Sequence, residues 1–254
     1  MRVRLSFSAL REGTELPLDH QHAVASLIYS ALDTGSTEFA ANLHDVGFQS
    51  GGRTFKFFTF SRVLTHKAFR NGDQLVLEDP NIELQVSSPV HEFIEHLVAG
   101  LSRQEKLQIA NGRFRLTHSE LIPPPRFAER MSFRALSPIT ESVRVAPDHP
   151  TFLSLADNWS EVMQRNLMRK YEALHGQPPE DQRLVWTWDK DYIDSAERRG
   201  KRLSVLRDIH GIKVRGWLAP FVAEGSRELI ELGYEAGFGA RNSMGFGMSE
   251  LNRA

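Results

Sequence analysis

A glycine-rich segment, residues 233–248, carries the clearest chemical signal in the sequence. It reads GYEAGFGARNSMGFGM and holds five glycines in sixteen residues. This density predicts a backbone that turns sharply or approaches another group closely, because glycine adopts positive φ without a steric cost. Exposed amides in such a loop, together with Arg241, are suited to holding phosphate groups. The segment therefore predicts an anion-binding loop, with an irregular hairpin as the alternative.

Better-known sites do not fit the same residues. A GxGxxG dinucleotide fingerprint would need glycine where the chain has Asn242, and only twelve residues follow to build a βαβ unit. A Walker motif is excluded because no Gly-Lys-Ser/Thr occurs. His91 and His96 imitate a zinc-protease HExxH, but they lie one residue too far apart and about 140° from each other on a helix. The absence of cysteine removes thiolate metal sites and disulfides.

Basic residues gather in two stretches, although the chain has a formal net charge of −1. Residues 196–215 hold seven cations against two acidic residues, and residues 103–134 hold seven against three. Basic stretches on a neutral body are suited to a polyanion such as a nucleic acid. Solvated strand faces are the plainer alternative for either stretch.

The elements that position these groups repeat one order twice. The first half predicts strands over residues 3–9, 54–62, 82–86 and 113–121, with helices over residues 19–33 and, after Ser88-Pro89 as cap and first turn, 93–101. The second half predicts strands over residues 131–136, 183–189, 201–217 and 245–251, with helices over residues 151–175 and 220–232. Each half thus reads β-α-β-β-α-β, which predicts an α+β chain of two tandem ferredoxin-like (RRM-like) domains.

Three consecutive prolines, residues 123–125, separate the halves, since they cannot continue a strand ladder. We therefore expect an N-terminal domain over residues 1–122, a linker over 123–130 and a C-terminal domain over 131–254. Strand 201–217 is expected to be a hairpin around His210-Gly211, and Gly233 to be the left-handed cap of the preceding helix. Trp186 and Trp188 share one face of a strand, which favours core positions over a base-stacking platform.

The 254-residue chain has enough apolar material, 41%, for a core, and it holds no run of about 18 apolar residues. The first residues turn charged too soon for a signal peptide. A cytoplasmic protein without a membrane anchor is expected.

Three motifs together resemble the CRISPR-associated repeat-RNA endoribonucleases of the repeat-associated mysterious protein (RAMP) superfamily. GFGARNSMGFG resembles the glycine-rich loop of that family, FAANLHDVGF followed by FKFFTFSRVL resembles its histidine loop and second strand, and SSP before the helix at residues 93–101 also matches. The resemblance covers most of the chain. It implies tandem ferredoxin-like domains and a metal-independent enzyme without a cofactor. It also implies precursor CRISPR repeat RNA as the substrate, which the enzyme cuts by 2′-hydroxyl attack to leave a 2′,3′-cyclic phosphate and a 5′-OH.

Cleavage of this kind needs a general base, a general acid and a cation near the phosphate. The resemblance at LHDVGF assigns His44, in the predicted loop 40–52, to proton transfer. Tyr29 falls about 130° from the centre of the apolar stripe of its helix and so points away from the core, where family members can carry a catalytic tyrosine. The third group is open between Arg53 and Lys56, because the family's lysine lies closer to the histidine.

The expected RNA-binding residues belong to the basic stretch at residues 196–215, to the glycine-rich loop and to the strand after His44: Arg53, Arg198, Arg199, Lys201, Arg202, Gly237, Gly239, Arg241, Asn242 and Ser243. The rival hypothesis is a non-catalytic RNA-binding subunit of a CRISPR effector complex with the same fold. Association with such a complex and a homodimer are both open partner expectations.

Overall fold

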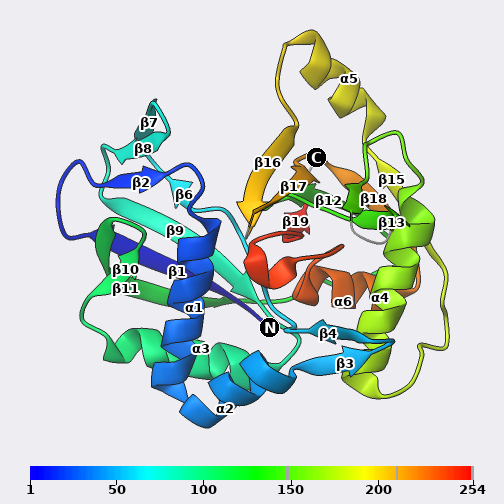
Figure 1. Cartoon of the computed structure of the whole chain (residues 1–254), viewed down its shortest axis with the longest axis horizontal. Coiled ribbons are helices and arrows are strands. Elements are labelled where there is room, and N and C mark those ends of the chain that lie inside the picture. The colour runs from blue at the N-terminus through cyan, green and yellow to red at the C-terminus, as the bar shows by residue number, and fades with distance from the viewer. Residues whose placement is uncertain (147–148, 210, 253–254) are drawn as a thin grey trace.

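The computed structural model describes residues 1–146, 149–209 and 211–252, in two α+β halves that pack side by side (Figure 1). Each half is built on one antiparallel sheet with helices against it. Residues 123–128, which include the three prolines, lie outside any helix or strand and connect the halves. No helix of the described chain is long and apolar enough to cross a membrane.

The N-terminal sheet has β1 (Arg2–Ala9) near its centre. Its strand order is β10-β11-β1-β9-β5, and the other four strands have the bounds Leu107–Ile109, Gly112–Ile122, Asn81–Ser87 and Thr59–Phe60. The short strand β6 (Leu64–Thr65) also pairs with β9. Val3, Leu5 and Phe7 alternate along β1 and are fully buried, because a strand presents every second residue to one face of its sheet. That face is covered by α1 (Gln21–Gly35) and α3 (His91–Arg103).

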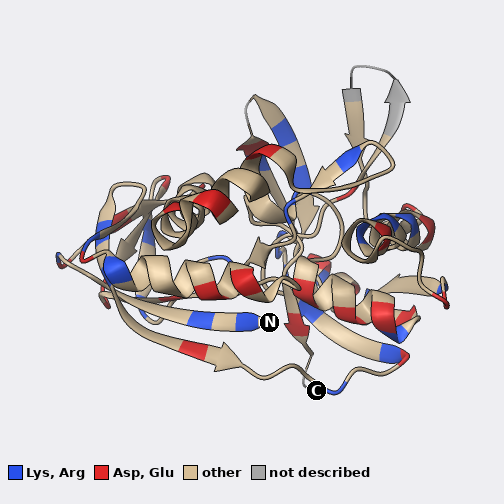
Figure 2. Cartoon of the chain, turned by 90° about the horizontal axis from the view of Figure 1, so that it is seen from below, with Lys and Arg blue, Asp and Glu red and all other residues tan. Residues whose placement is uncertain are grey.

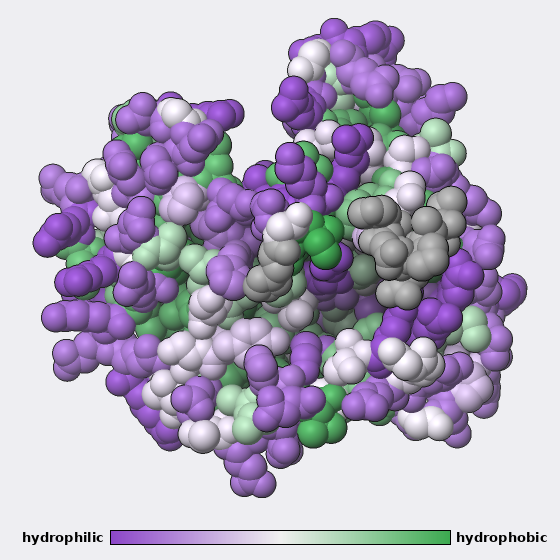
Figure 3. Space-filling model, viewed as in Figure 1, coloured by the Kyte–Doolittle hydropathy of each residue, from purple (hydrophilic) through white to green (hydrophobic). Residues whose placement is uncertain are grey.

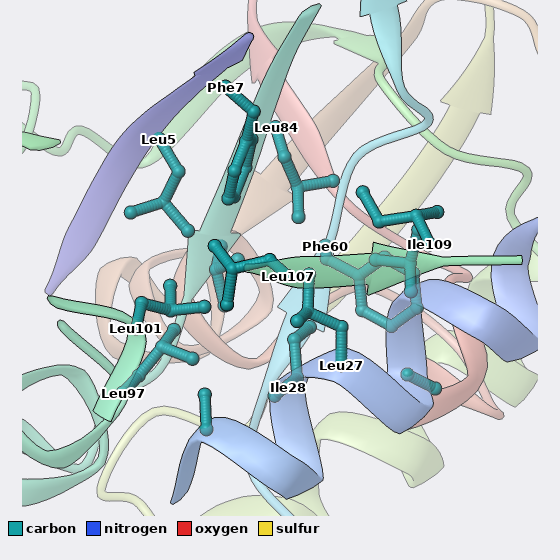
Figure 4. Close-up of a cluster of buried hydrophobic side chains, with 14 of the residues drawn as sticks. Leu5, Phe7, Leu27, Ile28, Phe60, Leu84, Leu97, Leu101, Leu107 and Ile109 are labelled. Atoms are coloured by element: carbon teal, nitrogen blue, oxygen red, sulfur yellow. The ribbon is translucent and has the colours of Figure 1, made fainter. Parts of the chain in front are cut away.

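Two glycines let α1 and α3 cross closely beneath this sheet. A β-carbon at Gly100 would collide with the carbonyl of Ala31, and one at Gly35 would collide with the carbonyl of His96. The helices therefore approach backbone to backbone, and the leucines around the crossing fill the space up to the sheet (Figure 4). This packing fixes the orientation of α1, which carries Tyr29.

The C-terminal half repeats the arrangement. Its sheet has the order β15-β18-β12-β19, with bounds Leu184–Trp188, Phe221–Gly225, Arg130–Ala135 and Ser249–Leu251. The helices α4 (Trp159–His175) and α6 (Arg227–Ala236) pack against it and against each other. Trp186 and Trp188 are buried in its core, as expected, and Trp186 stacks on Phe221 with ring centroids 3.8 Å apart.

Smaller elements decorate the two sheets. The N-terminal half adds a three-stranded sheet of β2 (Glu15–Pro17), β8 (Gln74–Leu77) and β7 (Ala68–Asn71), the helix α2 (Thr37–Ala41), and the hairpin β3 (Phe48–Ser50) and β4 (Arg53–Phe55). The C-terminal half adds the hairpins β13 (Ser142–Ala146)–β14 (His149–Phe152) and β16 (Ser204–Ile209)–β17 (Ile212–Trp217), and the helix α5 (Lys190–Arg198). Both of these hairpins rise from the same side of the molecule (Figure 2).

Several expected boundaries were wrong. The segment expected as one helix over residues 220–232 is instead the strand β18 followed by the helix α6. Helix α6 begins only after Ser226, which caps it by accepting a hydrogen bond from the amide of Leu229. Gly233 lies inside α6 against Phe238, and Gly237, at φ +89°, ends the helix instead. The first part of the helix expected over residues 151–175 is taken up by β14 and a turn, so that α4 begins at Trp159.

Other elements were placed correctly but paired differently. The hairpin expected over residues 201–217 forms, with His210 outside the described residues, yet it stands apart from the main sheet, whose third strand in sequence is β18. The strand expected over residues 54–62 is interrupted at Phe57, which has φ +46° and is buried. Helix α3 begins at His91, two residues after Pro89, while Ser88 accepts from the amide of Val90.

Polar contacts join the halves. Arg2 is buried, donates to the carbonyls of Ser249 and Tyr234 at 2.8 Å each, and stacks on the Tyr234 ring at 3.7 Å. Thr59 of β5 donates to the carbonyl of Phe246 at 2.9 Å. These contacts lock the glycine-rich segment of the C-terminal half against the N-terminal sheet and helix α1.

Candidate active site

Tyr29 and His44 meet at the boundary between the two halves. Tyr29 lies on α1, and its ring is 5.9 Å, centroid to centroid, from the ring of His44 in an edge-on arrangement. Tyr29 also packs edge-on against the buried ring of Phe58, at 5.6 Å, and is itself only half-buried. Tyr29 therefore lies at the edge of the N-terminal core, with its ring beside that of His44.

His44 lies on a single wide turn of helix, residues 42–46, which continues α2 directly. The segment expected as a loop is therefore helical, and Gly47 ends it at φ +58°. The side chain of His44 is 71% exposed, which leaves it accessible to a large substrate. Its Nδ1 lies 2.9 Å from a carboxylate oxygen of Asp45. Because a carboxylate accepts the Nδ1 hydrogen, this contact favours the tautomer in which Nε2 is free to take a proton.

Lys56 does not point freely into solvent. Its Nζ donates to the carbonyls of Leu43 at 2.6 Å and His44 at 2.5 Å. Burial lowers the pKa of Lys56, and the charge of Asp45 works in the opposite direction. The ammonium group therefore holds the end of the turn that carries His44, with one of its three hydrogens still available.

The glycine-rich segment reaches Tyr29 from the opposite side. A short 3₁₀ turn, η2 (Asn242–Met244), packs against α1 and β5. Ser243 lies close enough to the hydroxyl of Tyr29 to affect its pKa. Burial raises the pKa of Tyr29 and the nearby Ser243 side chain only partly offsets this, so the phenol is neutral at physiological pH. We call residues 237–247 the glycine loop.

Lys170 of α4 holds the glycine loop in place through hydrogen bonds. It is fully buried, and its Nζ donates to the carbonyls of Gly237 and Gly239 and to Oδ1 of Asn242, at 2.6 to 2.8 Å. Burial lowers its pKa to about 7, and the nearby carboxylate of Glu141 raises it. Since three acceptors surround Nζ, the arrangement fits the ammonium form, with three hydrogens.

Lys170 was not among the expected site residues. Its position was the available signal, because it shares the buried face of α4 with Met163 and Leu167 at spacings of seven and three residues. A lysine on the apolar stripe of a helix needs a partner inside the protein. Here the partners are the loop carbonyls and Glu141.

The glycines of the loop are required by contacts within the protein. A β-carbon at Gly239, φ +74°, would lie 2.5 Å from the carbonyl oxygen of Thr140, and one at Gly247 would collide with the carbonyl of Phe238. Loop amides at Phe238, Ala240 and Gly247 donate to protein carbonyls. The loop is therefore a built structure whose shape is set by the C-terminal half, rather than a flexible strap.

A cavity of about 270 Å³ opens between these groups. Lys56 and Phe58 line it from the N-terminal half, and Lys170, Asn242 and Ser243 from the C-terminal half. Two of the expected cations, Arg53 and Arg241, lie on its wall. Arg241 adopts φ +60° and lies 5.9 Å from the ring of Phe152. The structure thus gathers Arg53, Lys56 and the glycine loop around one cavity. Tyr29 and His44 do not line it themselves, but Phe58 packs on Tyr29 and Lys56 binds the carbonyl of His44.

Four expected RNA-binding residues lie elsewhere. Arg198 ends α5, and Arg199, Lys201 and Arg202 follow it; α5 lies at the top of the view in Figure 1, whereas α2 and β3, which flank His44, lie at the bottom. Lys201 donates to the hydroxyl of Tyr192 at 2.8 Å. The structure therefore does not bring this basic stretch to the cavity. Within the described residues, no group of three or more His, Asp or Glu is arranged to hold a metal ion.

Comparisons with known proteins agree over almost the whole chain. Residues 15–120 match the family model described as CRISPR-associated protein Cas6, N-terminal, and residues 122–251 match that of CRISPR associated protein Cas6, C-terminal. The chain is 31% identical over 98% of its length to the CRISPR-associated endoribonuclease Cas6 1 of Methanocaldococcus jannaschii, of which it covers 91%. It is 26% identical over 93% of its length to the CRISPR-associated endoribonuclease Cas6 of Pyrococcus furiosus, of which it covers 84%.

A solved structure described as CRISPR associated protein Cas6 superimposes on the whole chain with a TM-score of 0.79 and 29% identity, over 99% of that structure. The family expected from the sequence motifs is confirmed by these matches. This chain belongs to the Cas6 family of CRISPR-associated endoribonucleases, within the RAMP superfamily.

Proposed function

We propose that this Cas6 protein binds CRISPR repeat RNA and cuts the precursor transcript once within each repeat, which releases guide RNAs. The observation that carries the proposal is the meeting of His44 and Tyr29, with ring centroids 5.9 Å apart, beside a cavity that the glycine loop helps to line. The relatives described as endoribonucleases support it. An exposed histidine on a helical turn beside a neutral phenol is suited to proton transfer, and a purely binding protein has no need of it.

In the proposed reaction, the 2′-oxygen of the RNA attacks its own neighbouring phosphorus. Nε2 of His44 takes the 2′-OH proton, because Asp45 engages Nδ1. The bond from phosphorus to the 5′-oxygen breaks as the bond to the 2′-oxygen forms. Tyr29, whose pKa is raised by burial, supplies a proton to the departing 5′-oxygen. The products are a 2′,3′-cyclic phosphate and a 5′-OH.

Lys56 is suited to the role of the stabilising cation, although it lies farther from His44 in the sequence than the family's lysine does from its histidine. Two of its hydrogens bind the carbonyls of Leu43 and His44, and the third is available to a phosphate oxygen. Arg53 and Arg241, on the wall of the same cavity, are suited to the flanking phosphates. The glycine loop contributes to RNA binding through Gly239, Asn242 and Ser243, which line the cavity, while the buried Gly237 supports the shape of the loop. Arg198, Arg199, Lys201 and Arg202 would serve only a long RNA that also reaches α5.

We also infer that each half is a ferredoxin-like unit, with limits at residues 1–122 and 131–254 and a linker over 123–130. The shared strand order supports this. The four main strands of the N-terminal sheet lie side by side in the order β11-β1-β9-β5, and those of the C-terminal sheet in the order β19-β12-β18-β15. Counted along the chain, both sheets therefore place the fourth strand beside the first, then the third, then the second.

The decisive experiment incubates the protein with labelled repeat RNA in EDTA. We expect cleavage at one position with a 2′,3′-cyclic phosphate end, because histidine, tyrosine and lysine supply the needed groups. A single 2′-deoxy nucleotide on the 5′ side of the cut should block cleavage and leave binding intact, since the nucleophile is gone. RNA that stays intact with and without divalent metal would favour the binding-subunit alternative.

Tyr29→Phe is expected to slow cleavage by roughly 100-fold, the lower end of the range for one acid–base group, because it removes only the hydroxyl. The phenylalanine keeps the contacts with His44 and Phe58. Single-turnover rates and thermal melting, measured together, test this. Tyr192→Phe, which removes a hydroxyl on α5, is the matched control. A normal rate for Tyr29→Phe would remove Tyr29 from the mechanism.

A further inference from the structure

A second, larger cavity of about 690 Å³ adjoins the one at Lys56. It lies between α4, the base of the β13–β14 hairpin and the glycine loop, and it shares Arg53, Asn166 and Arg241 with the first cavity. The surface in this view is hollowed near its centre, between the two halves (Figure 3). A strand of RNA at the candidate active site would therefore continue into this cavity.

Arginines dominate the charge of the second cavity. Four of them line it: Arg53, Arg165, Arg169 and Arg241. Arg165 has an ion pair with Glu161 at 3.8 Å, between side chains that are both about half exposed or more, and such a pair is weak. Among the described lining residues the sole carboxylate is that of Glu141. The guanidinium groups are suited to phosphate oxygens, so the cavity favours a nucleotide over an uncharged ligand.

Two buried side chains among the lining residues carry acceptor atoms that lack a donor partner. Glu141 and Asn166 are each 3% exposed and line the cavity. Oε2 of Glu141 accepts from the amide of Ser142 at 3.2 Å, but its Oε1 and the Oδ1 of Asn166 have no hydrogen-bond partner among the described residues. Buried acceptors of this kind are normally satisfied, and leaving them unpaired is costly.

Positive charges on α4 and β4 lie near the Glu141 carboxyl group. Burial raises the pKa of Glu141, and Lys170, the amide of Ser142, Arg53 and Arg165 offset this only in part. Because Lys170 holds three acceptors as an ammonium ion, Glu141 remains its carboxylate counter-ion. A carboxylate only accepts, so the missing partner must bring N–H or O–H groups.

We propose that the second cavity binds a guanine nucleotide of the RNA substrate, close to the cut. Its base donates N1–H and the 2-amino group to Glu141 and Asn166, and its phosphates lie on the arginines. Guanine is favoured because its pairing edge carries two adjacent N–H donors, whereas adenine and uracil each carry one donor group beside an acceptor. The proposal rests on the proposed function, since it assigns the ligand as part of the repeat RNA.

The test measures the dissociation constants of four labelled pentanucleotides, UUGUU, UUIUU, UUAUU and UUCUU, by fluorescence anisotropy at fixed salt. Inosine lacks only the 2-amino group. We expect wild type to bind UUGUU about 10-fold or more tightly than UUAUU, with UUIUU between them, as a good bidentate base contact discriminates by about that factor. Free GMP should compete weakly, because it lacks the flanking phosphates.

Asn166→Ala should reduce the preference for UUGUU over UUIUU and leave the Glu141–Lys170 pair in place. Glu141→Gln should abolish the preference altogether, and Glu197→Gln on α5 is the matched control that should keep it. Equal affinities of wild type for all four pentanucleotides, in a preparation that cleaves repeat RNA, would overturn the guanine site and leave the proposed function standing. GMP binding as tight as UUGUU would overturn the assignment to RNA. Failure to cleave or bind any RNA would instead count against the proposed function.

Discussion

His44→Ala is expected to slow cleavage of repeat RNA by a factor of about 100 or more, because it removes the proposed general base. The dissociation constant for RNA should change little. The imidazole is 71% exposed and touches the protein at Asp45 and at the edge of Tyr29, so its loss opens no cavity in the core. Single-turnover cleavage rates at saturating protein, compared with RNA affinity measured under the same conditions, separate the two effects.

His118→Ala is the matched control, since His118 is an exposed histidine on β11, on the N-terminal sheet. It should cleave at the wild-type rate. A loss of RNA affinity as large as the loss of rate in His44→Ala would show that His44 holds a phosphate rather than moving a proton. The pH dependence offers a further test, because the limb of the rate profile that reports the general base should disappear in the variant.

Lys170→Met is expected to destabilise the protein by about 3–5 kcal/mol, because it leaves Glu141 as an uncompensated buried charge. For a chain of this size the melting temperature should fall by roughly 10 °C. Below that temperature, cleavage should still slow by roughly 10- to 100-fold, because Gly237, Gly239 and Asn242 lose the ammonium group that sets the position of Ser243 against Tyr29.

Lys106→Met removes an exposed lysine and should leave both quantities unchanged. The double variant Lys170→Met, Glu141→Gln separates charge from positioning. It should recover part of the lost stability, since the unpaired carboxylate is gone, but not the cleavage rate. Recovery of both would mean that Lys170 only neutralises Glu141 and does not position the loop.

The sequence predicted the order of the elements better than their limits. Every second residue of β1 (Val3, Leu5 and Phe7) and the apolar face of α1 are buried, as expected, because each element packs one face on the core. The error at residues 220–232 has a physical cause. Phe221 and Ala223 alternate as a central strand, but Pro220 before them and the periodic residues after Ser226 favour a longer helix from sequence alone.

Site residues with a recognisable motif or helix position could be predicted from the sequence. Residues whose role depends on contacts with distant parts of the chain could not. His44 and the glycine loop were recognisable from their motifs, and Tyr29 from its angle on the helix. Lys56 was not assignable, because the turn at Phe57 that directs it to the carbonyls of Leu43 and His44 depends on the burial of that ring. Lys170 contacts a segment about 70 residues later, which local spacing does not reveal.

The approach of Ser243 to Tyr29 has a consequence for when the proposed activity can begin during synthesis of the protein. The ribosome makes Tyr29 and His44 long before the glycine loop, and N-terminal domains generally fold first. A nascent chain that has folded its first half therefore carries both residues without the segment that borders them. Under the proposed function, cleavage of nearby RNA would begin only once the second half has been made and has docked, so that translation itself sets the earliest moment of cleavage.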